Sequence, residues 1–230
     1  VGGHGEDALK LAQALYDIAI VQTVPVSDTK TAEAVKITEN VFRSVNIALV
    51  NELKVVYAKM GIDVHEVLDA ADTKPFGFMK FTPGPGLGGH CIPIDPFYLT
   101  WKAREFQENT RFIELAGEIN THMPEYVVEQ TSKALNTHKK AVNGSKILLI
   151  GLAYKPNVDD MRESPTFELM HLLEELGAEV AFYDSYIPTI PPTREHAEYT
   201  GRNSVEWNQA IISEFDAVLI ATNHSDINYQ

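Results

Sequence analysis

Hydrophobic positions follow two different patterns along this chain. In the first part they recur every three to four residues, which is typical of helices with one packed face, and in the second part they form short unbroken runs. The strongest helical stretch runs from Thr31 to Met60, and Gly61 provides a natural stop. Its apolar face consists of Val35, Val41, Val45, Leu49, Leu53 and Val56.

This helix would be about 45 Å long at 1.5 Å per residue. A single small domain cannot cover so long an apolar face. We therefore expect the helix to connect two domains, to pair with a second copy of itself, or to do both.

Shorter elements are predicted on both sides of the long helix. Residues 5–20 are expected to form a helix, and residues 22–28 a strand followed by a turn. Further helices are predicted over 63–71, 109–121 and 124–136.

Two of the expected helix starts carry capping residues. Asp63, with Glu66 three positions later, has the pattern of a capping box. Asp95 is a plausible N-cap, with Pro96 at the first helical position. Such a cap contributes about 1 kcal/mol, and residue type alone favours this structural role of Asp95 over a catalytic one.

The second part of the chain reads as a β-α-β unit. Residues 146–154 form a continuous apolar run, as expected of a strand buried on both faces. Ser164 then caps a helix over 165–176, and 178–184 is the next strand, which requires a parallel sheet. Residues 215–224 contain a further strand, whereas 187–205 form a proline-rich excursion. The predicted fold class is α/β: a long central helix and helical dimerisation region, followed by a Rossmann-like parallel-sheet C-terminal domain.

Composition narrows the function classes. The formal net charge of -13 argues against a nucleic-acid or anionic-membrane surface, because both attract clustered Lys and Arg. No apolar run approaches the roughly 20 residues that span a bilayer. The single cysteine cannot form an internal disulfide and suits a reducing cytoplasm. No metal site is predicted. The first residue is Val1, not Met, so we expect a fragment of a longer protein.

One glycine pattern is misleading. Gly84, Gly86 and Gly89 have the G-x-G-x-x-G spacing of a dinucleotide fingerprint, but that motif needs a buried strand before it and a helix directly after it. Here Pro75 and Gly77 interrupt the preceding segment. The loop after the 146–154 strand has one glycine, at the strand end, so no complete cofactor site of the usual kind is visible.

The only cysteine, Cys91, lies in the glycine- and proline-rich stretch "TPGPGLGGHCIPIDPFYL". A lone cysteine is most often an inert buried residue. Here it directly precedes a predicted helix start, where the helix dipole favours a thiolate, and nearby glycines allow a ligand to approach the backbone. A nucleophile and a redox sensor are the two alternatives to inert packing. His90 next to it is not a convincing catalytic partner.

Two further groups carry candidate chemistry. Lys36 and Asn40 lie four apart on one face of the long helix, and Arg43 continues that face. They form either a solvated stripe or the lining of a cleft. Lys155 and Arg162 lie in a loop at the carboxyl end of the first strand, where parallel sheets bind ligands and cations can meet phosphate.

Several of these stretches together resemble one known family. "AEAVKITENVFRSVNIALVNEL", "FTPGPGLGGHCIPIDPFYL" and "GLAYKPNVDDMRESP" are similar to the UDP-glucose/GDP-mannose dehydrogenase family, nearest its UDP-N-acetylglucosamine 6-dehydrogenase branch. The resemblance covers nearly the whole chain, with the motifs in the same order. It implies oxidation of the C6 alcohol of a nucleotide sugar to a carboxylate with two NAD consumed, and a role in making surface polysaccharide.

The resemblance implies roles for individual residues. Cys91 matches the nucleophile that holds the C6 carbon as a thiohemiacetal and then as a thioester. Lys36 and Asn40 match groups that stabilise oxyanions, and Asp95 matches an aspartate that positions or activates water. The segment that wraps the substrate corresponds to Thr82, Pro83, Gly84, Pro85, Gly86 and Leu87, followed by Gly88. Tyr154 and Lys155 match a substrate-contacting pair, and Arg162 an arginine that reaches NAD.

The same resemblance implies a division of the chain into domains, and the chain departs from the family pattern at two points. Residues 1–28 would be a remnant of the NAD-binding domain, 29–142 the central dimerisation and catalytic domain, and 143–230 the UDP-binding domain. Most of the NAD-binding domain is missing, so the fragment alone is expected to be inactive. Ile94 stands where the UDP-glucose branch has a lysine, which favours an N-acetyl sugar. UDP-N-acetylmannosamine, or a non-catalytic nucleotide-binding and dimerising module, are the alternatives.

Overall fold

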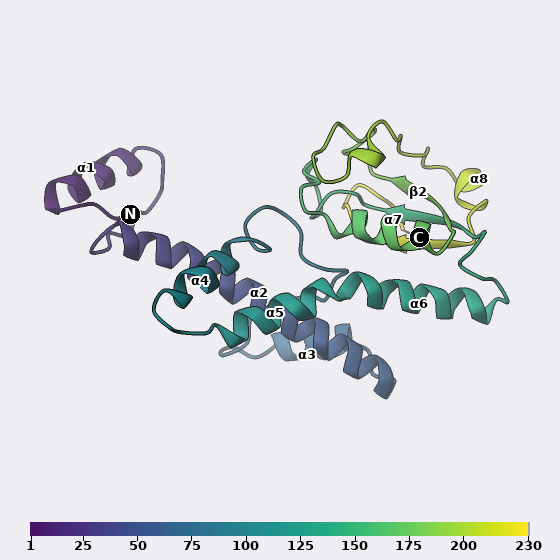
Figure 1. Ribbon diagram of the computed structural model, residues 1–230, viewed down its shortest axis with the longest axis horizontal. Helices are drawn as coiled ribbons and strands as arrows, with labels where there is room; N and C mark the ends of the chain where they lie inside the picture. The colour runs from purple at the N-terminus through teal and green to yellow at the C-terminus, as the bar shows by residue number, and fades with distance from the viewer. Residues whose placement is uncertain (230) are drawn as a thin grey trace.

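The long helix α2 (Thr29–Met60) is the axis of the helical part of the molecule. The computed structural model describes residues 1–229, and Figure 1 shows α2 running obliquely through the helical part, where it crosses α5. Asp28 caps its start by accepting a hydrogen bond from the Thr31 N–H at 2.7 Å. Gly61 ends it in the left-handed conformation, with φ of 72°. The predicted helix and its glycine stop are both confirmed.

Shorter helices surround this axis. Those packed against α2 are α3 (Val64–Asp72), α4 (Asp95–Arg104) and α5 (Arg111–Thr121). Helix α1 (Glu6–Tyr16) lies apart at the N-terminal end, whereas α6 (Met123–Thr137) leads away from α5 towards the sheet (Figure 1). Within residues 1–229 no helix is both long and apolar enough to cross a membrane.

The second part of the chain forms a parallel sheet of three strands, in the order β2-β1-β3. The strands are β1 (Lys146–Ile150), β2 (Glu179–Tyr183) and β3 (Ala217–Ile220). In the central strand, Leu148 pairs with Ala181 on one side and with Val218 on the other. Its apolar run is fully buried because both faces of the strand are covered. The predicted α/β class, helical first and parallel-sheeted second, is confirmed.

Helices cover the sheet unequally. Helix α7 (Pro165–Glu175) connects β1 to β2 and begins at the predicted cap, where Ser164 accepts a hydrogen bond from Thr166. The larger core lies on this face, and α6 joins it through Val128 and Leu135. Helix α6 therefore packs the helical part onto the sheet part. The short segments η1 (Ala197–Tyr199) and α8 (Gln209–Ile212) lie in the connection from β2 to β3.

The structure corrects one predicted element and shortens another. Residues 22–28 do not form a strand; their backbone is tied to the N-terminus by the Val26 N–H donating to the Val1 carbonyl. A strand needs a neighbouring strand, and the described residues offer none there. The first strand of the sheet ends at Ile150 instead of continuing to 154, because Gly151 turns the chain with φ of 89°.

Candidate active site

The loop between α3 and α4 is anchored to the helical part by buried amide side chains. Asn51 of α2 accepts a hydrogen bond from the Gly84 N–H at 3.0 Å and donates one to Asn120 of α5 at 2.9 Å. Asn120 in turn donates to the Ser44 carbonyl at 3.1 Å. Buried amides must be satisfied in this way, so the start of the predicted substrate loop has a fixed position. Our sequence reasoning missed these residues, although Asn51 is a polar interruption of an apolar helix.

The end of the same loop rests on the other part of the molecule. A side chain on Gly88 would place its Cβ 2.5 Å from the Tyr154 Cβ, and one on Gly89 would come within 2.8 Å of the Tyr154 ring. The Gly89 N–H donates to the Arg162 carbonyl at 3.0 Å. Both glycines are required because the backbone lies directly against Tyr154. In the structure, then, it is a side chain of this protein that approaches these glycines closely.

Cys91 lies just after this contact, and its side chain is exposed. The interpretation that it is an inert buried residue is therefore wrong. Its carbonyl accepts a hydrogen bond from the Asp95 N–H at 2.9 Å, in the turn that leads into α4. Among the described residues, the thiol makes no hydrogen bond with Lys36 or Asn40.

Asp95 is joined to the long helix rather than capping its own helix. It is the first residue of α4, and Ile94 stands at the N-cap position without a side-chain hydrogen bond. The Asp95 carboxylate instead accepts a hydrogen bond from the Asn40 Nδ2 at 2.7 Å. The expectation that Asp95 caps the helix is wrong, because a buried amide competes for the carboxylate and the packing of α4 on α2 brings the two together.

Asn40 also accepts hydrogen bonds from two cationic side chains. Its Oδ1 accepts from the Lys36 Nζ at 3.4 Å and from the Arg43 Nη1 at 3.3 Å, and the residue is completely buried. The alternative that these residues form a solvated stripe is therefore wrong for Asn40, whereas Lys36 and Arg43 are exposed. The structure brings Lys36, Asn40 and Asp95 into one cluster next to the turn that carries Cys91.

The loop after β1 carries the second predicted group. Arg162 forms a two-pronged pair with Asp160, from Nε to Oδ1 at 2.9 Å and from Nη2 to Oδ2 at 2.6 Å. This hydrogen bonding lowers the pKa of Asp160 and raises that of Arg162. Lys155 is exposed at the loop tip, with its Nζ 5.3 Å from the centre of the Tyr154 ring. Of the two predicted cations, Lys155 projects from the loop and Arg162 already has a carboxylate partner.

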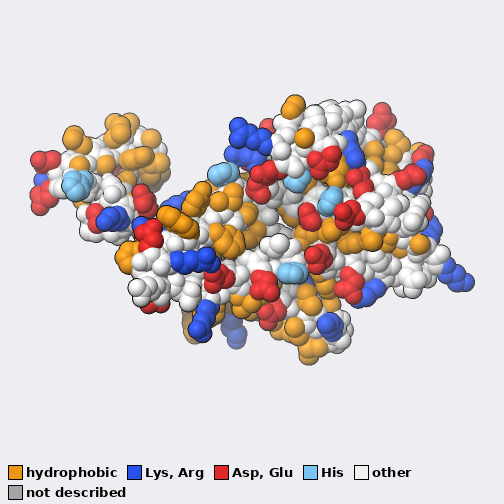
Figure 2. Space-filling model, viewed as in Figure 1, with side chains coloured by type: hydrophobic (Ala, Val, Ile, Leu, Met, Phe, Trp, Pro, Cys, Tyr) orange, Lys and Arg blue, Asp and Glu red, His pale blue; other side chains and the backbone are white. Residues whose placement is uncertain are grey.

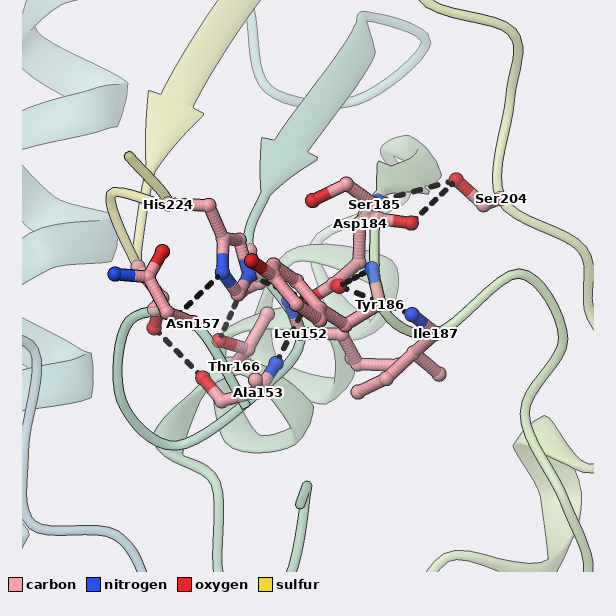
Figure 3. Close-up of polar contacts among 12 residues, drawn as sticks. Leu152, Ala153, Asn157, Thr166, Asp184, Ser185, Tyr186, Ile187, Ser204 and His224 are labelled. Carbon is pink, nitrogen blue, oxygen red and sulfur yellow. Dashed lines mark hydrogen bonds and ion pairs between the residues drawn. The ribbon is translucent and has the colours of Figure 1, made fainter. Parts of the chain in front are cut away.

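A buried carboxylate–imidazole pair lies at the carboxyl edge of the sheet (Figure 3). Asp184 follows β2 and His224 follows β3, and the distance from Nε2 to Oδ2 is 3.0 Å. Both side chains are fully buried. The Asp184 carboxylate also accepts four backbone N–H bonds, from Leu152, Ala153, Tyr186 and Ile187. The charge is therefore satisfied by five donors, as a buried charge requires.

This pair holds both ends of the Tyr154 loop. Asp184 binds the N–H groups of residues 152 and 153, while the His224 Nδ1 accepts the Asn157 N–H at 3.0 Å. Since a backbone N–H can only donate, His224 carries its proton on Nε2 and donates to Asp184. The Asn157 Oδ1 accepts two bonds from Ser225, from the N–H at 2.9 Å and from Oγ at 3.0 Å. We did not predict these residues, although ends of parallel strands meet at one edge.

Cavities lie on both sides of the predicted substrate loop. One of about 400 Å³ includes Gly86, Leu87 and Glu163 in its lining. Another of about 240 Å³ includes Pro83, Pro85 and Lys54. Burial, followed by a hydrogen bond with Glu195, raises the pKa of Glu163. The loop therefore separates two hollows between the helical part and the sheet part.

Two family models match this chain. Residues 30–122 match the central domain of the UDP-glucose/GDP-mannose dehydrogenase family, and residues 148–230 match the UDP binding domain of the same family. UDP-N-acetyl-D-glucosamine 6-dehydrogenase from Pseudomonas aeruginosa is 35% identical over 225 residues, which cover 97% of this chain and 51% of that protein.

Relatives named for another sugar are similar to the same degree. UDP-N-acetyl-D-mannosamine dehydrogenase from Methanocaldococcus jannaschii is 40% identical over 187 residues, or 81% of this chain and 41% of that protein. The solved structure of UDP-D-ManNAc dehydrogenase from Pyrococcus horikoshii has a TM-score of 0.84 at 33% identity, covering 97% of this chain and 50% of that one. The chain spans about half the length of these relatives. It belongs to the UDP-glucose/GDP-mannose dehydrogenase family, of which it carries the central and UDP-binding domains.

Proposed function

We propose that the full protein oxidises the C6 alcohol of UDP-N-acetylglucosamine to the uronic acid, with Cys91 as the nucleophile. The observation that carries this proposal is the position of an exposed thiol one turn before Asp95, whose carboxylate is bonded to buried Asn40 beside the Lys36 ammonium. The cysteine is exposed, and the cluster of Asp95, Asn40 and Lys36 is joined to its turn through the hydrogen bond from the Asp95 N–H to the Cys91 carbonyl.

Each of these residues has a chemical task. The Cys91 thiolate adds to the C6 aldehyde and forms a thiohemiacetal; after oxidation to the thioester, water replaces the sulfur and the thiol is released with the acid. Negative charge develops on oxygen in both tetrahedral stages, and Lys36 with Asn40 supplies the ammonium and amide donors that stabilise it. Asp95, held by Asn40, positions the water.

NAD, when bound, supplies the oxidising power by accepting hydride. The described residues do not fit the usual cradle for it: no strand precedes Gly84, and α4 begins only at Asp95. Arg162, assigned to NAD by resemblance, is already paired with Asp160. No step is therefore derived through NAD at this site.

The two anchored loops would supply the contacts to the substrate. Residues 82–88 wrap the sugar nucleotide, and their two ends are held by Asn51 and Tyr154. Lys155, exposed at the tip of its loop, offers an ammonium to the diphosphate, and Tyr154 forms the adjoining contact.

The domain division and the oligomeric state are further parts of the proposal. We assign residues 1–28, 29–142 and 143–230 to the NAD-domain remnant, the central domain and the UDP-binding domain. The central domain would form a homodimer through α2, because Leu49 and Val56 remain 53% and 43% exposed and Leu115 of α5 is 51% exposed. Exposed hydrophobic side chains also gather over α1 (Figure 2). A monomer in sedimentation at micromolar concentration would contradict the dimer.

Substrate identity is decided by turnover of the full-length protein with each sugar. Ile94, in place of the lysine of the UDP-glucose branch, favours an N-acetyl sugar. Faster turnover of UDP-N-acetylmannosamine than of UDP-N-acetylglucosamine would replace the assignment with the alternative. The 230 residues alone act as a nucleotide-binding, dimerising module, and NADH production by them would overturn that view.

The central experiment is Cys91→Ser in the full-length protein, with His90→Ala as a control at the neighbouring exposed position. Aldehyde-to-acid turnover should be lost in Cys91→Ser while binding of the UDP-sugar, measured by calorimetry, is retained. His90→Ala should retain both. If Cys91→Ser loses binding as well, the cysteine has a structural role.

A further inference from the structure

The segment that leads to Cys91 is supported by an aromatic ring from another part of the chain. Gly88 and Gly89 lie so close to Tyr154 that neither position has room for a Cβ, with distances of 2.5 Å and 2.8 Å to the nearest Tyr154 atoms. Gly89 is buried and has φ of 81°, a conformation that glycine adopts without strain. The contact joins the loop before α4 to the loop after β1.

A hydrogen-bonded unit holds that ring in place. The Tyr154 N–H donates to the Asp160 carbonyl at 3.0 Å, and the Asp160 carboxylate binds the Arg162 guanidinium. The Arg162 carbonyl accepts the Gly89 N–H at 3.0 Å. Gly89 is therefore fixed to the loop after β1 by its ring contact and by its own backbone hydrogen bond.

The other end of the cysteine segment is fixed elsewhere. The Asp95 N–H donates to the Cys91 carbonyl, and the Asp95 carboxylate binds Asn40 of α2. Gly89 and Asp95 thus belong to two separate anchors, one on the sheet part and one on the long helix. Cys91 lies between them, so the position of its sulfur depends on both.

The ring position is set by the protein's own buried groups. Asp184 and His224 hold the backbone on both sides of Tyr154, as Figure 3 shows for residues 152, 153 and 157. The seat for Gly89 is therefore built from residues of this chain. The adjoining Lys155 ammonium lies 5.3 Å from the ring centre, within reach of a cation–π attraction.

We infer that Tyr154 is a positioning residue for the Cys91 thiol, and that through it nucleotide binding at Lys155 is coupled to the cysteine. The first half follows from the two-anchor geometry. The second half rests on the proposed function: a diphosphate that attracts the Lys155 ammonium acts on the residue whose ring supports Gly89. Tyr154 would then have a task besides touching the substrate.

The test measures alkylation of Cys91 by iodoacetamide, followed by mass spectrometry, with and without UDP. The variants are Tyr154→Ala, Tyr154→Phe and the control Tyr98→Ala, which removes a 63% exposed tyrosine of α4. Without UDP, Tyr154→Ala should change the alkylation rate by at least about threefold, because the segment loses the ring that supports Gly89 and the surroundings of the exposed thiol change. Tyr154→Phe and Tyr98→Ala should match the wild type.

Measurements with UDP test the second half of the inference, the coupling of nucleotide binding to Cys91. UDP should change the alkylation rate of the wild type and Tyr154→Phe but not that of Tyr154→Ala, although calorimetry still detects UDP binding to that variant. In the full-length protein, Tyr154→Ala should lower kcat about tenfold or more while the KM for the sugar nucleotide changes less than about threefold. Because partial unfolding would also lower kcat without changing KM, Tyr154→Ala must show the same cooperative unfolding transition as the wild type, and Tyr154→Phe, which keeps the ring, should retain the wild-type kcat.

Several outcomes would overturn the inference. A folded Tyr154→Ala variant with wild-type alkylation shows that the ring does not position the segment, and loss of UDP binding with unchanged alkylation makes Tyr154 a ligand contact only. If Tyr154→Ala fails to fold, Gly89→Ala displaces the same contact from the other side and must change the alkylation rate. Absence of UDP binding to the wild type contradicts the proposed function but leaves the UDP-free comparison decisive.

Discussion

Replacing Asp184 with asparagine should strongly destabilise the sheet part. The side chain keeps its size but exchanges one carboxylate oxygen for an NH₂ group, which can only donate. In the native protein Oδ2 accepts from Leu152, Ala153 and His224, while Oδ1 accepts from Tyr186 and Ile187. Whichever way the new amide turns, at least two buried donors face another donor.

The magnitude follows from those donors. A buried hydrogen-bonding group left without a partner costs about 1–3 kcal/mol, so two of them cost about 2–6 kcal/mol. A typical domain has a total stability of about 5–15 kcal/mol. Asp184→Asn should therefore remove a large part of the stability of the sheet part and loosen the Tyr154 loop.

Urea unfolding followed by tryptophan fluorescence measures this loss. The chain contains two tryptophans, and Trp207 packs on Tyr183 of β2 with ring centres 4.7 Å apart. A Trp101→Phe background leaves Trp207 as the reporter of the sheet part. The midpoint should fall in Asp184→Asn, and the m-value should stay the same if the unfolding transition is otherwise unaltered.

Asp226→Asn is the matched control, because Asp226 is exposed at the same edge of the sheet and its carboxylate accepts a 3.2 Å hydrogen bond from the Ser185 hydroxyl. It should change stability by less than about 0.5 kcal/mol. A loss below about 1 kcal/mol in Asp184→Asn would refute the reasoning, since it would mean that the backbone donors find other acceptors.

Two further substitutions test other parts of the structure. Gly151→Ala should destabilise by about 2 kcal/mol or more in the same urea assay, since φ is 89° and the new Cβ would lie 2.2 Å from the Thr222 carbonyl oxygen; an unchanged midpoint would contradict this geometry. Glu163→Gln tests the pKa of Glu163, raised by burial and by Glu195. A raised carboxyl pKa means that the folded state binds more protons than the unfolded one, so wild-type stability falls as pH rises from about 4.5 through the folded pKa. Thermal unfolding between pH 4 and 8 should show the stability of Glu163→Gln increasing relative to that of the wild type as pH rises. The same pH dependence in both proteins would refute the raised pKa of Glu163.

Local sequence patterns were sufficient for most of the secondary structure. The spacing of apolar residues predicted α2, Gly61 marked its end, and Ser164 marked the start of α7. The unbroken apolar run at β1 predicted a strand covered on both faces. These predictions succeed because caps, stops and periodicity involve residues within a few positions of one another. The strand expected at 22–28 failed because a strand also needs a partner elsewhere.

Tertiary structure alone decided how the candidate chemistry is assembled. The sequence pointed to Cys91, Lys36, Asn40 and Asp95, but a local rule made Asp95 a cap, whereas it binds Asn40, 55 positions away. Asp184 and His224 are 40 positions apart and meet only because parallel strands end at one edge of the sheet. Contacts over such separations depend on the packing of whole elements, which residue spacing does not specify.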